Sequence, residues 1–203
     1  ILKMYVDENV LNFMSSREYE VSLLENETIE ASIAFIDICG FTAISETETP
    51  DYVVNLLNEY FDIMVKEIIE QKGIVDKFIG DAIMAVFKGP FHLDRAIDAS
   101  LNIRNAIDKL PVAVGESRYK PRVSIGINSG EMVSGNIGSS TLRRLDYTVI
   151  GDKVNLASRL QSAATVNQIL INEENYQKIN NSFVCKKIGE MSFKNKEVPV
   201  VVY

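Results

Sequence analysis

The chain has 203 residues, of which 46% are hydrophobic and 24% charged, a composition that argues against disorder and suffices for one domain with its own core. Its 21 basic and 28 acidic residues give a formal charge of −7 and are mixed along the chain, which argues against a nucleic-acid surface but allows a local site for a small anion. No apolar stretch reaches the ~20 residues of a membrane helix, and no signal peptide is visible.

The cysteines suggest a cellular compartment, and the first residue suggests that the sequence is part of a longer protein. Cys39 and Cys185 form no metal-binding spacing, so we expect two reduced, buried thiols and an intracellular, cytoplasmic domain. Because the first residue is Ile1, we expect a piece of a longer protein whose upstream regulatory or sensor region, with any membrane anchor, precedes it.

Residues 1–28 are expected to form a lead-in helix and loop, followed by a first strand over 31–37, "ASIAFID". Apolar residues recur at i, i+3 and i+4 over 50–72, which predicts an amphipathic helix with Gly73 as its C-terminal stop. The next run, "IVDKFIGDAIMAVF", predicts a hairpin with a two-residue turn at Gly80-Asp81.

The second half continues with a helix over 93–110, with His92 before it as a surface or capping residue, and a strand pair joined at Ser129-Gly130. After a polar loop at 138–146 come a strand, a turn and a helix with Asp152 as N-cap, then shorter C-terminal elements. Interleaved strands, hairpins and helices predict an α/β sandwich with a mixed, mainly antiparallel sheet, formed as one domain over 29–203.

Two carboxylates stand where chemistry is expected. Asp37 ends the first strand and Asp81 lies at the hairpin tip, so both reach the same edge if these elements pair in one sheet. Such an edge offers oxygen ligands to Mg²⁺ while leaving positions open for phosphate oxygens. The alternative is that Asp81 only completes a Gly-Asp turn and Asp37 only caps a loop.

Polar and basic residues add to this pattern. Backbone N–H groups around Gly40 suit a triphosphate, and Lys77 lies on the same hairpin as Asp81. Asn155 and Arg159 are four residues apart and share one face of a predicted helix. The alternatives to a functional role are that Lys77 is an ordinary solvated lysine and that Arg159 pairs with a nearby acid. Further cations stand at loops or strand ends, namely Arg143, Arg144 and Lys194.

Four motifs carry a family resemblance. The segments "FIDICGFT", "DKFIGDAIMAVF", "GINSGEMVSGNIG" and "YTVIGDKVNLASRLQ" are similar to the catalytic domain of class III nucleotidyl cyclases and follow that family's order from about residue 31 to 203. The resemblance implies a ferredoxin-like βαββαβ core with extra C-terminal elements. It also implies an adenylyl cyclase that converts ATP to 3',5'-cyclic AMP and pyrophosphate.

The resemblance implies roles for matching positions. Asp37 and Asp81, with the carbonyl of Ile38, match the family's ligands for two divalent cations per site, Mg²⁺ or Mn²⁺. Asn155 matches the residue that orients the ribose, and Arg159 matches the one that stabilises the transition state. The positions that match phosphate-binding residues are Gly40, Phe41, Thr42, Arg143 and Lys194. The family usually has glycine where this chain has Asn195, which leaves Lys194 the weakest of these matches.

Lys77 and Thr148 match the pair that reads the purine. A Lys77 ammonium facing adenine N1 and a Thr148 hydroxyl accepting from N6 leave nothing unpaired, whereas guanine would set its N1–H against the ammonium. The family's guanylyl cyclases usually have glutamate at the lysine position, and Thr148 resembles the bicarbonate-responsive subgroup. These residues therefore favour ATP.

In this family the metal aspartates come from one subunit, and the purine pair, asparagine and arginine from its partner. A chain that carries both sets implies a head-to-tail homodimer with two equivalent sites. The alternatives are a non-catalytic cyclase-like module that binds nucleotide or only dimerises, and a guanylyl cyclase of the same fold.

Overall fold

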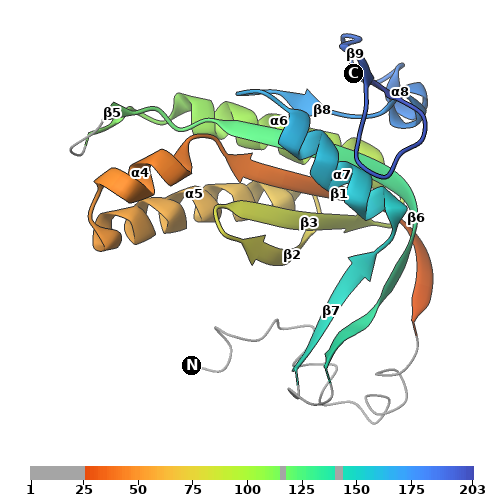
Figure 1. Cartoon of the computed structure of the whole chain (residues 1–203), viewed down its shortest axis with the longest axis horizontal. Coiled ribbons are helices and arrows are strands. Elements are labelled where there is room, and N and C mark those ends of the chain that lie inside the picture. Colours follow the sequence, from red (N-terminus) through yellow and green to blue (C-terminus); the bar gives the residue numbers. More distant parts are fainter. Residues whose placement is uncertain (1–25, 115–117, 140–143) are drawn as a thin grey trace.

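The computed structural model describes residues 26–114, 118–139 and 144–203, so the expected lead-in at 1–25 lies outside the described residues (Figure 1). Its main sheet has six strands, with the path β2-β3-β1-β6-β7 and β8 beside β6. These strands are β1 (Glu27–Ile38), β2 (Ile74–Ile79), β3 (Ala82–Lys88), β6 (Val123–Ser139), β7 (Arg144–Ile150) and β8 (Ile169–Leu170). All pairs are antiparallel except β6 with β8, which confirms a mixed, mainly antiparallel sheet.

Five helices accompany the sheet among the described residues: α4 (Phe41–Thr47), α5 (Pro50–Glu70), α6 (His92–Lys109), α7 (Asp152–Ala163) and α8 (Glu173–Ile179). Two small hairpins complete the structure, formed by β4 (Ala113–Val114) with β5 (Arg118–Tyr119) and by β9 (Gly189–Met191) with β10 (Val200–Val202). The chain order β1, α5, β2, β3, α6, β6 and the sheet order β2-β3-β1-β6 give the expected βαββαβ core.

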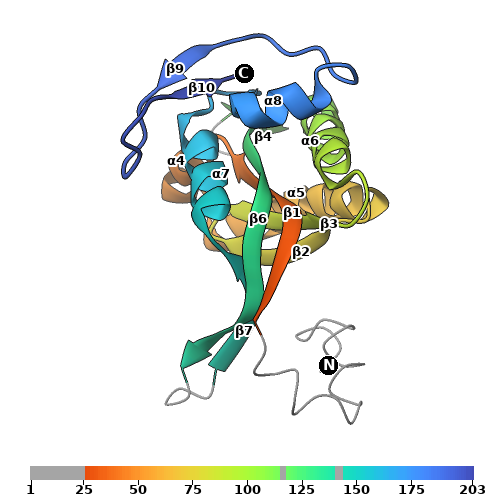
Figure 2. The same ribbon diagram turned by 90° about the vertical axis from the view of Figure 1, so that its right-hand side faces the viewer.

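Helices cover both faces of the sheet. Figure 2 shows α5 and α6 on one side and α7 on the other. Ile36 of β1 packs with Met64 of α5 and Ile103 of α6, whereas Ile33 of β1 packs in a second cluster with Ala157 of α7. Because successive strand residues point to opposite faces, a strand covered on both sides reads as the unbroken apolar run seen in the sequence. Each fully buried large aliphatic side chain contributes roughly 1.5–3 kcal/mol.

The predicted helix over 50–72 and the hairpin after it are confirmed, with one correction. The residue in the left-handed conformation after α5 is Lys72, with φ 55°, and not Gly73. Gly73 is instead required by packing, since a Cβ atom there would lie 2.5 Å from the Phe87 ring. The two-residue turn between β2 and β3 is Gly80-Asp81, as predicted.

The prediction of two strands joined by a turn at Ser129-Gly130 is wrong. Residues 123–139 form one continuous strand, and its pairing with β1 runs without a break from Val123 opposite Ile38 to Ser134 opposite Glu27. Gly130 has a φ of 145°, which favours glycine, but the chain does not reverse there because β1 pairs on both sides of it.

The start of α7 also differs from the prediction. Its N-cap is Gly151, and Asp152 is the first helical residue, whose carboxylate binds Lys196 with an Nζ–Oδ2 distance of 2.6 Å. The two cysteines are free, as predicted, but half-buried. Within the part of the chain that the structure describes, no helix is both long and apolar enough to cross a membrane.

Candidate active site

The structure brings the two predicted metal ligands together. Asp37 pairs with Ala82, the neighbour of Asp81, so both carboxylates lie at one end of the β1–β3 ladder. Burial raises the pKa of Asp37, and the charge of Asp81 raises it further. Two carboxylates that repel each other gain from a cation between them, so this pair fits a divalent metal.

The described residues hold no group of three or more His, Cys, Asp or Glu side chains suited to a metal. Any cation bound by Asp37 and Asp81 would therefore need further oxygen ligands, from the backbone or the substrate. The carbonyl of Ile38, at the end of β1, is the predicted backbone ligand.

The predicted phosphate loop leads into α4, a helix that sequence reasoning missed. Gly40 is the N-cap with φ 77°, Phe41 is buried, and Thr42 is exposed in the first turn. The loop is held from β5, because the Tyr119 hydroxyl donates a hydrogen bond of 2.8 Å to the Cys39 carbonyl oxygen. Nothing in the local sequence marks Tyr119, whose partner is eighty residues away.

The two residues predicted to read the purine, Lys77 and Thr148, lie close together, and a third residue, Asp76, contacts both of them. Lys77 lies on β2 and Thr148 on β7, and both contact the carboxylate of Asp76. Thr148 Oγ1 donates to Asp76 Oδ2 at 2.8 Å, and Lys77 Nζ lies 3.3 Å from the same oxygen. The "DKFIGD" motif contained Asp76, but its contact with Thr148 depends on the fold.

Asn155 and Arg159 lie one turn apart on α7, as predicted. The Asn155 side chain is exposed and Arg159 is half-buried. Nη1 of Arg159 is buried and has no hydrogen-bond partner among the described residues, which is costly for a guanidinium nitrogen and would be relieved by an anionic group. Among the described contacts, neither side chain is joined to Asp37 or Asp81.

The remaining phosphate-binding predictions are less defined. Arg143 lies outside the described residues, and the side chain of Arg144 is not described. Lys194 is exposed in a turn closed by the Lys196 amide donating to the Phe193 carbonyl at 3.1 Å. Asn195 has φ 60°, a left-handed conformation that glycine adopts freely and that asparagine tolerates better than most residues.

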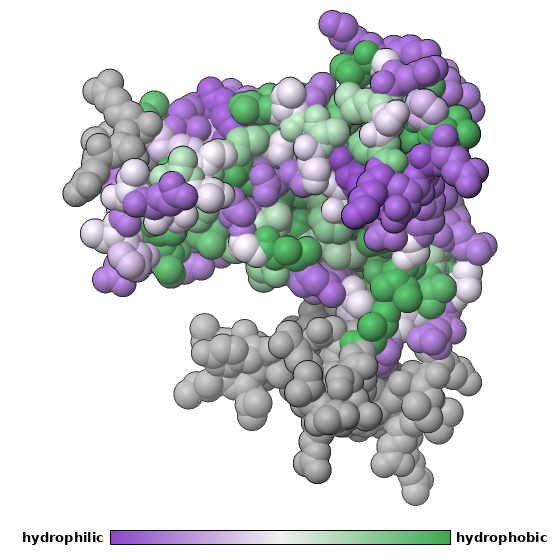
Figure 3. Space-filling view, in the orientation of Figure 1, coloured by the Kyte–Doolittle hydropathy of each residue, from purple (hydrophilic) through white to green (hydrophobic). Residues whose placement is uncertain are grey.

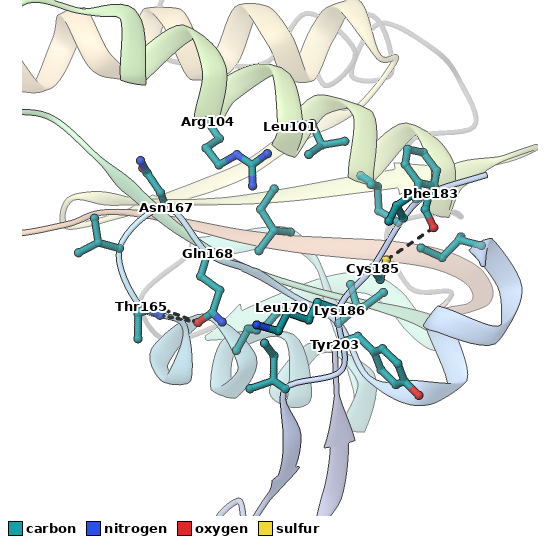
Figure 4. A pocket seen from close by; sticks show the side chains of 17 residues that line it. Leu101, Arg104, Thr165, Asn167, Gln168, Leu170, Phe183, Cys185, Lys186 and Tyr203 are labelled. Atoms are coloured by element: carbon teal, nitrogen blue, oxygen red, sulfur yellow. Dashed lines mark hydrogen bonds between the residues drawn. The ribbon is translucent and has the colours of Figure 1, made fainter. Parts of the chain in front are cut away.

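A cavity of about 520 Å³ lies elsewhere, between α6, residues 165–171 and the C-terminal segment. Arg104, Cys185 and Tyr203 are among its lining residues (Figure 4). None of the predicted site residues lines it. This cavity is therefore separate from the candidate active site.

Comparison with solved structures supports the fold. The adenylyl cyclase CyaB from P. aeruginosa superimposes with a TM-score of 0.79 at 32% identity, covering 89% of this chain and 95% of that one. The guanylyl cyclase Cya2 gives a TM-score of 0.75 at 32% identity, covering 88% and 92%. Adenylyl and guanylyl cyclases are thus both similar in structure to this chain.

Curated relatives match a shorter part. An adenylate cyclase of Anabaena cylindrica is 41% identical over 140 residues, which are 66% of this chain and 27% of that protein. An uncharacterized protein of Mycobacterium tuberculosis is 38% identical over 147 residues, 72% of this chain and 26% of that protein. The chain thus spans about a quarter of each of these relatives. The family described as Adenylate and Guanylate cyclase catalytic domain matches residues 24–203. This match, with the fold and the motifs above, shows that the chain belongs to the class III nucleotidyl cyclase catalytic domains.

Proposed function

We propose that the chain, over residues 29–203, is an adenylyl cyclase catalytic domain that converts ATP to 3',5'-cyclic AMP and pyrophosphate. The observation that carries the choice of ATP is the meeting of Lys77 and Thr148 around one carboxylate. An ammonium and a hydroxyl side by side match N1 and N6 of adenine. Membership of the family alone does not decide between ATP and GTP, because adenylyl and guanylyl cyclases are both similar in fold to this chain.

The chain's own residues then have distinct tasks. Asn155 orients the ribose so that its 3'-oxygen faces the α-phosphorus, and Arg159 donates to the α-phosphate oxygens, where negative charge develops. A bond forms between the 3'-oxygen and the α-phosphorus while the bond to the β-phosphate oxygen breaks, and pyrophosphate leaves. The loop of Gly40, Phe41 and Thr42 holds the β- and γ-phosphates, with Arg143 and Lys194 as further cationic contacts.

Asp37, Asp81 and the Ile38 carbonyl would hold two divalent cations, Mg²⁺ or Mn²⁺. When bound, such cations lower the pKa of the 3'-hydroxyl and neutralise the triphosphate. No side chain among the described site residues is placed as a general base, so the proton leaves to water or to a substrate phosphate.

We further propose a head-to-tail homodimer in which the metal ligands of one chain face Lys77, Thr148, Asn155 and Arg159 of the other. The unpaired Nη1 of Arg159 supports this arrangement, because none of the described residues of its own chain accepts a hydrogen bond from it and a substrate phosphate bound at the interface could. Exposed apolar side chains on β2 and β7 also support it, among them Phe78 at 52% and Tyr147 at 54% exposure. Figure 3 shows hydrophobic surface where these two strands lie.

The test is a product assay of the purified protein with ATP or GTP and Mg²⁺ or Mn²⁺. The wild type is expected to form cyclic AMP from ATP, and Asp37→Ala and Arg159→Ala each to abolish it. Mixing these two variants should restore about a quarter of the activity, because half of randomly paired dimers contain one intact site of two.

A mixture of Asp37→Ala with Asp81→Ala is the matched control, since both substitutions damage the same half of the site and no activity should return. Cyclic GMP as the main product would replace the proposal by a guanylyl cyclase. A folded dimer with no cyclic product under any condition would replace it by a nucleotide-binding or dimerisation module.

A further inference from the structure

Asp76 joins the two strands that carry the purine pair. Its side chain is only 5% exposed, and the contacts described for its carboxylate are to Thr148 and Lys77. β2 is one edge of the main sheet and β7 ends the path on the other side, yet Asp76 and Thr148, seventy-two residues apart, meet at 2.8 Å. A buried carboxylate is costly unless it is paired and hydrogen-bonded, and here both partners belong to the nucleotide site.

A local irregularity in β2 makes this contact possible. Val75 pairs with Ala85 and Lys77 with Met84, so Asp76 is an extra residue in the strand, a β-bulge. In a regular strand, neighbouring side chains point to opposite faces. The bulge instead lets the side chains of Asp76 and Lys77 approach to 3.3 Å.

The contact has a chemical consequence for Thr148. An ionised carboxylate only accepts hydrogen bonds, so the single hydroxyl proton of Thr148 is donated to Asp76. The hydroxyl oxygen then has only lone pairs left for another partner. It can accept from the N6 amino group of adenine, but it has no proton to offer to O6 of guanine.

We propose that Asp76 is a specificity-determining residue of the cyclase, one that fixes Thr148 as an acceptor towards the base and holds the Lys77 ammonium beside it. This inference rests on the proposed function, in which Lys77 and Thr148 read the purine. Asp76 does not touch the base itself and acts only through these two residues. The site therefore selects adenine by the direction of its hydrogen bonds, in addition to the identity of its side chains.

The test replaces Asp76 by groups that can donate as well as accept, so that Thr148 is no longer required to be the donor. In Asp76→Asn the amide can donate, and in Asp76→Ser the smaller hydroxyl can donate or accept, so Thr148 can turn its own proton towards guanine O6. The ratio of kcat/KM for ATP over GTP is expected to fall about tenfold to a hundredfold, the effect of relieving one buried mismatch. Asp76→Glu keeps a carboxylate, which when ionised only accepts hydrogen bonds, and should keep the preference. Glu190→Gln, on the distant β9, removes an exposed charge and serves as the control.

Binding is measured in parallel with 3'-deoxy-ATP and 3'-deoxy-GTP, which lack the attacking hydroxyl and cannot cyclise. If the wild type forms no cyclic product but prefers 3'-deoxy-ATP and Asp76→Asn loses that preference, the catalytic part of the proposed function fails, while the role of Asp76 in the choice of base stands. If Asp76→Asn is a folded dimer whose ATP-over-GTP ratios stay within about twofold of wild type, below the worth of one hydrogen bond, the inference is overturned while the cyclase activity stands. If neither Asp76→Asn nor Asp76→Ser folds, Asp76 is a structural residue and the inference is overturned as well.

Discussion

Strand β6 and helix α7 approach so closely at Gly126 and Gln161 that a Cβ atom on the glycine would lie 2.1 Å from the Gln161 backbone nitrogen. It would also lie 2.4 Å from the Ala157 carbonyl oxygen. Arg159 lies between these two helical residues, so the absence of a side chain at Gly126 sets how closely the helix that carries the proposed transition-state arginine sits on the sheet.

Gly126→Ala is expected to lower the free energy of unfolding by roughly 1–3 kcal/mol, because the clash is with backbone and α7 must move. It should also lower kcat, since Arg159 moves with the helix. Urea denaturation measures the first effect. Gly135→Ala is the control for stability, because its Cβ atom would meet the rotatable side chain of Asn26. Equal losses in both variants would contradict the prediction.

Tyr119→Phe removes the hydroxyl that holds the Cys39 carbonyl. We expect a loss of about 0.5–1.5 kcal/mol in unfolding free energy, the worth of one hydrogen bond, and a higher KM for ATP because the phosphate loop loses its support. Tyr60→Phe is the control, since the Tyr60 ring lies 6.4 Å from that of Tyr119 but its hydroxyl makes none of the described hydrogen bonds. An unchanged KM in Tyr119→Phe would show that the loop is held by other contacts.

Substitutions of Asn195 test whether its left-handed backbone conformation positions the neighbouring Lys194. Asn195→Gly should retain activity, because glycine adopts φ near 60° freely, whereas Asn195→Val should cost about 1–2 kcal/mol and distort the turn. If Lys194 binds phosphate, Asn195→Val and Lys194→Ala should raise the KM for ATP by similar factors. Full activity of Lys194→Ala would remove Lys194 from the site.

Removing the charge of Asp37, one of the two proposed metal ligands, is expected to have opposite effects on stability and on activity. Because burial and Asp81 raise the pKa of Asp37, its charge opposes folding, and Asp37→Asn should raise the melting temperature in metal-free buffer while abolishing activity. Mg²⁺ should stabilise the wild type, and a chelator should reverse this. Asp37→Asn should lose most of the response. An equal response to Mg²⁺ in both proteins would place the cation elsewhere.

Features set by residues close in sequence were predictable. The periodicity of α5 and the Gly80-Asp81 turn depend on neighbours along the chain. The positions of Asp37 and Asp81 at the ends of their elements are also visible in the local sequence, and these elements pair. The cyclase motifs added the roles of residues on separate elements, such as Lys77 and Thr148, which no local pattern relates.

Features set by distant pairing were not predictable. Ser129-Gly130 has the composition of a turn, and only the unbroken ladder with β1 shows that the strand continues. Asp76 reaches Thr148 because of a bulge that exists only in the pairing of β2 with β3. Tyr119 supports the phosphate loop from another hairpin. In each case the deciding partner lies dozens of residues away, where sequence spacing carries no signal.

His92 was expected at the surface or as a cap, but it is half-buried, and its Nδ1 lies 2.8 Å from the Oγ of Ser32, which is fully buried. Burial lowers its pKa from the usual 6.5; the nearby Glu30 and Asp94 oppose this shift, whereas Lys178 and Arg95 add to it. The unfolded chain therefore takes up the proton first as the pH falls.

The stability that neutral His92 permits is fully present above pH about 6.5 and is lost as the pH falls through the lower folded pKa. Asp37 and Asp98, whose pKa values burial raises, act in the opposite direction and at lower pH, as the pH approaches their ordinary range. Since the chain has one histidine, His92→Gln should remove the loss between pH 7 and 5 and leave the carboxylate contribution unchanged. Urea denaturation across this range compares the two proteins, and the single imidazole resonance gives the folded pKa directly. Parallel curves for wild type and His92→Gln, or an imidazole pKa at or above 6.5, would contradict the burial of a neutral ring.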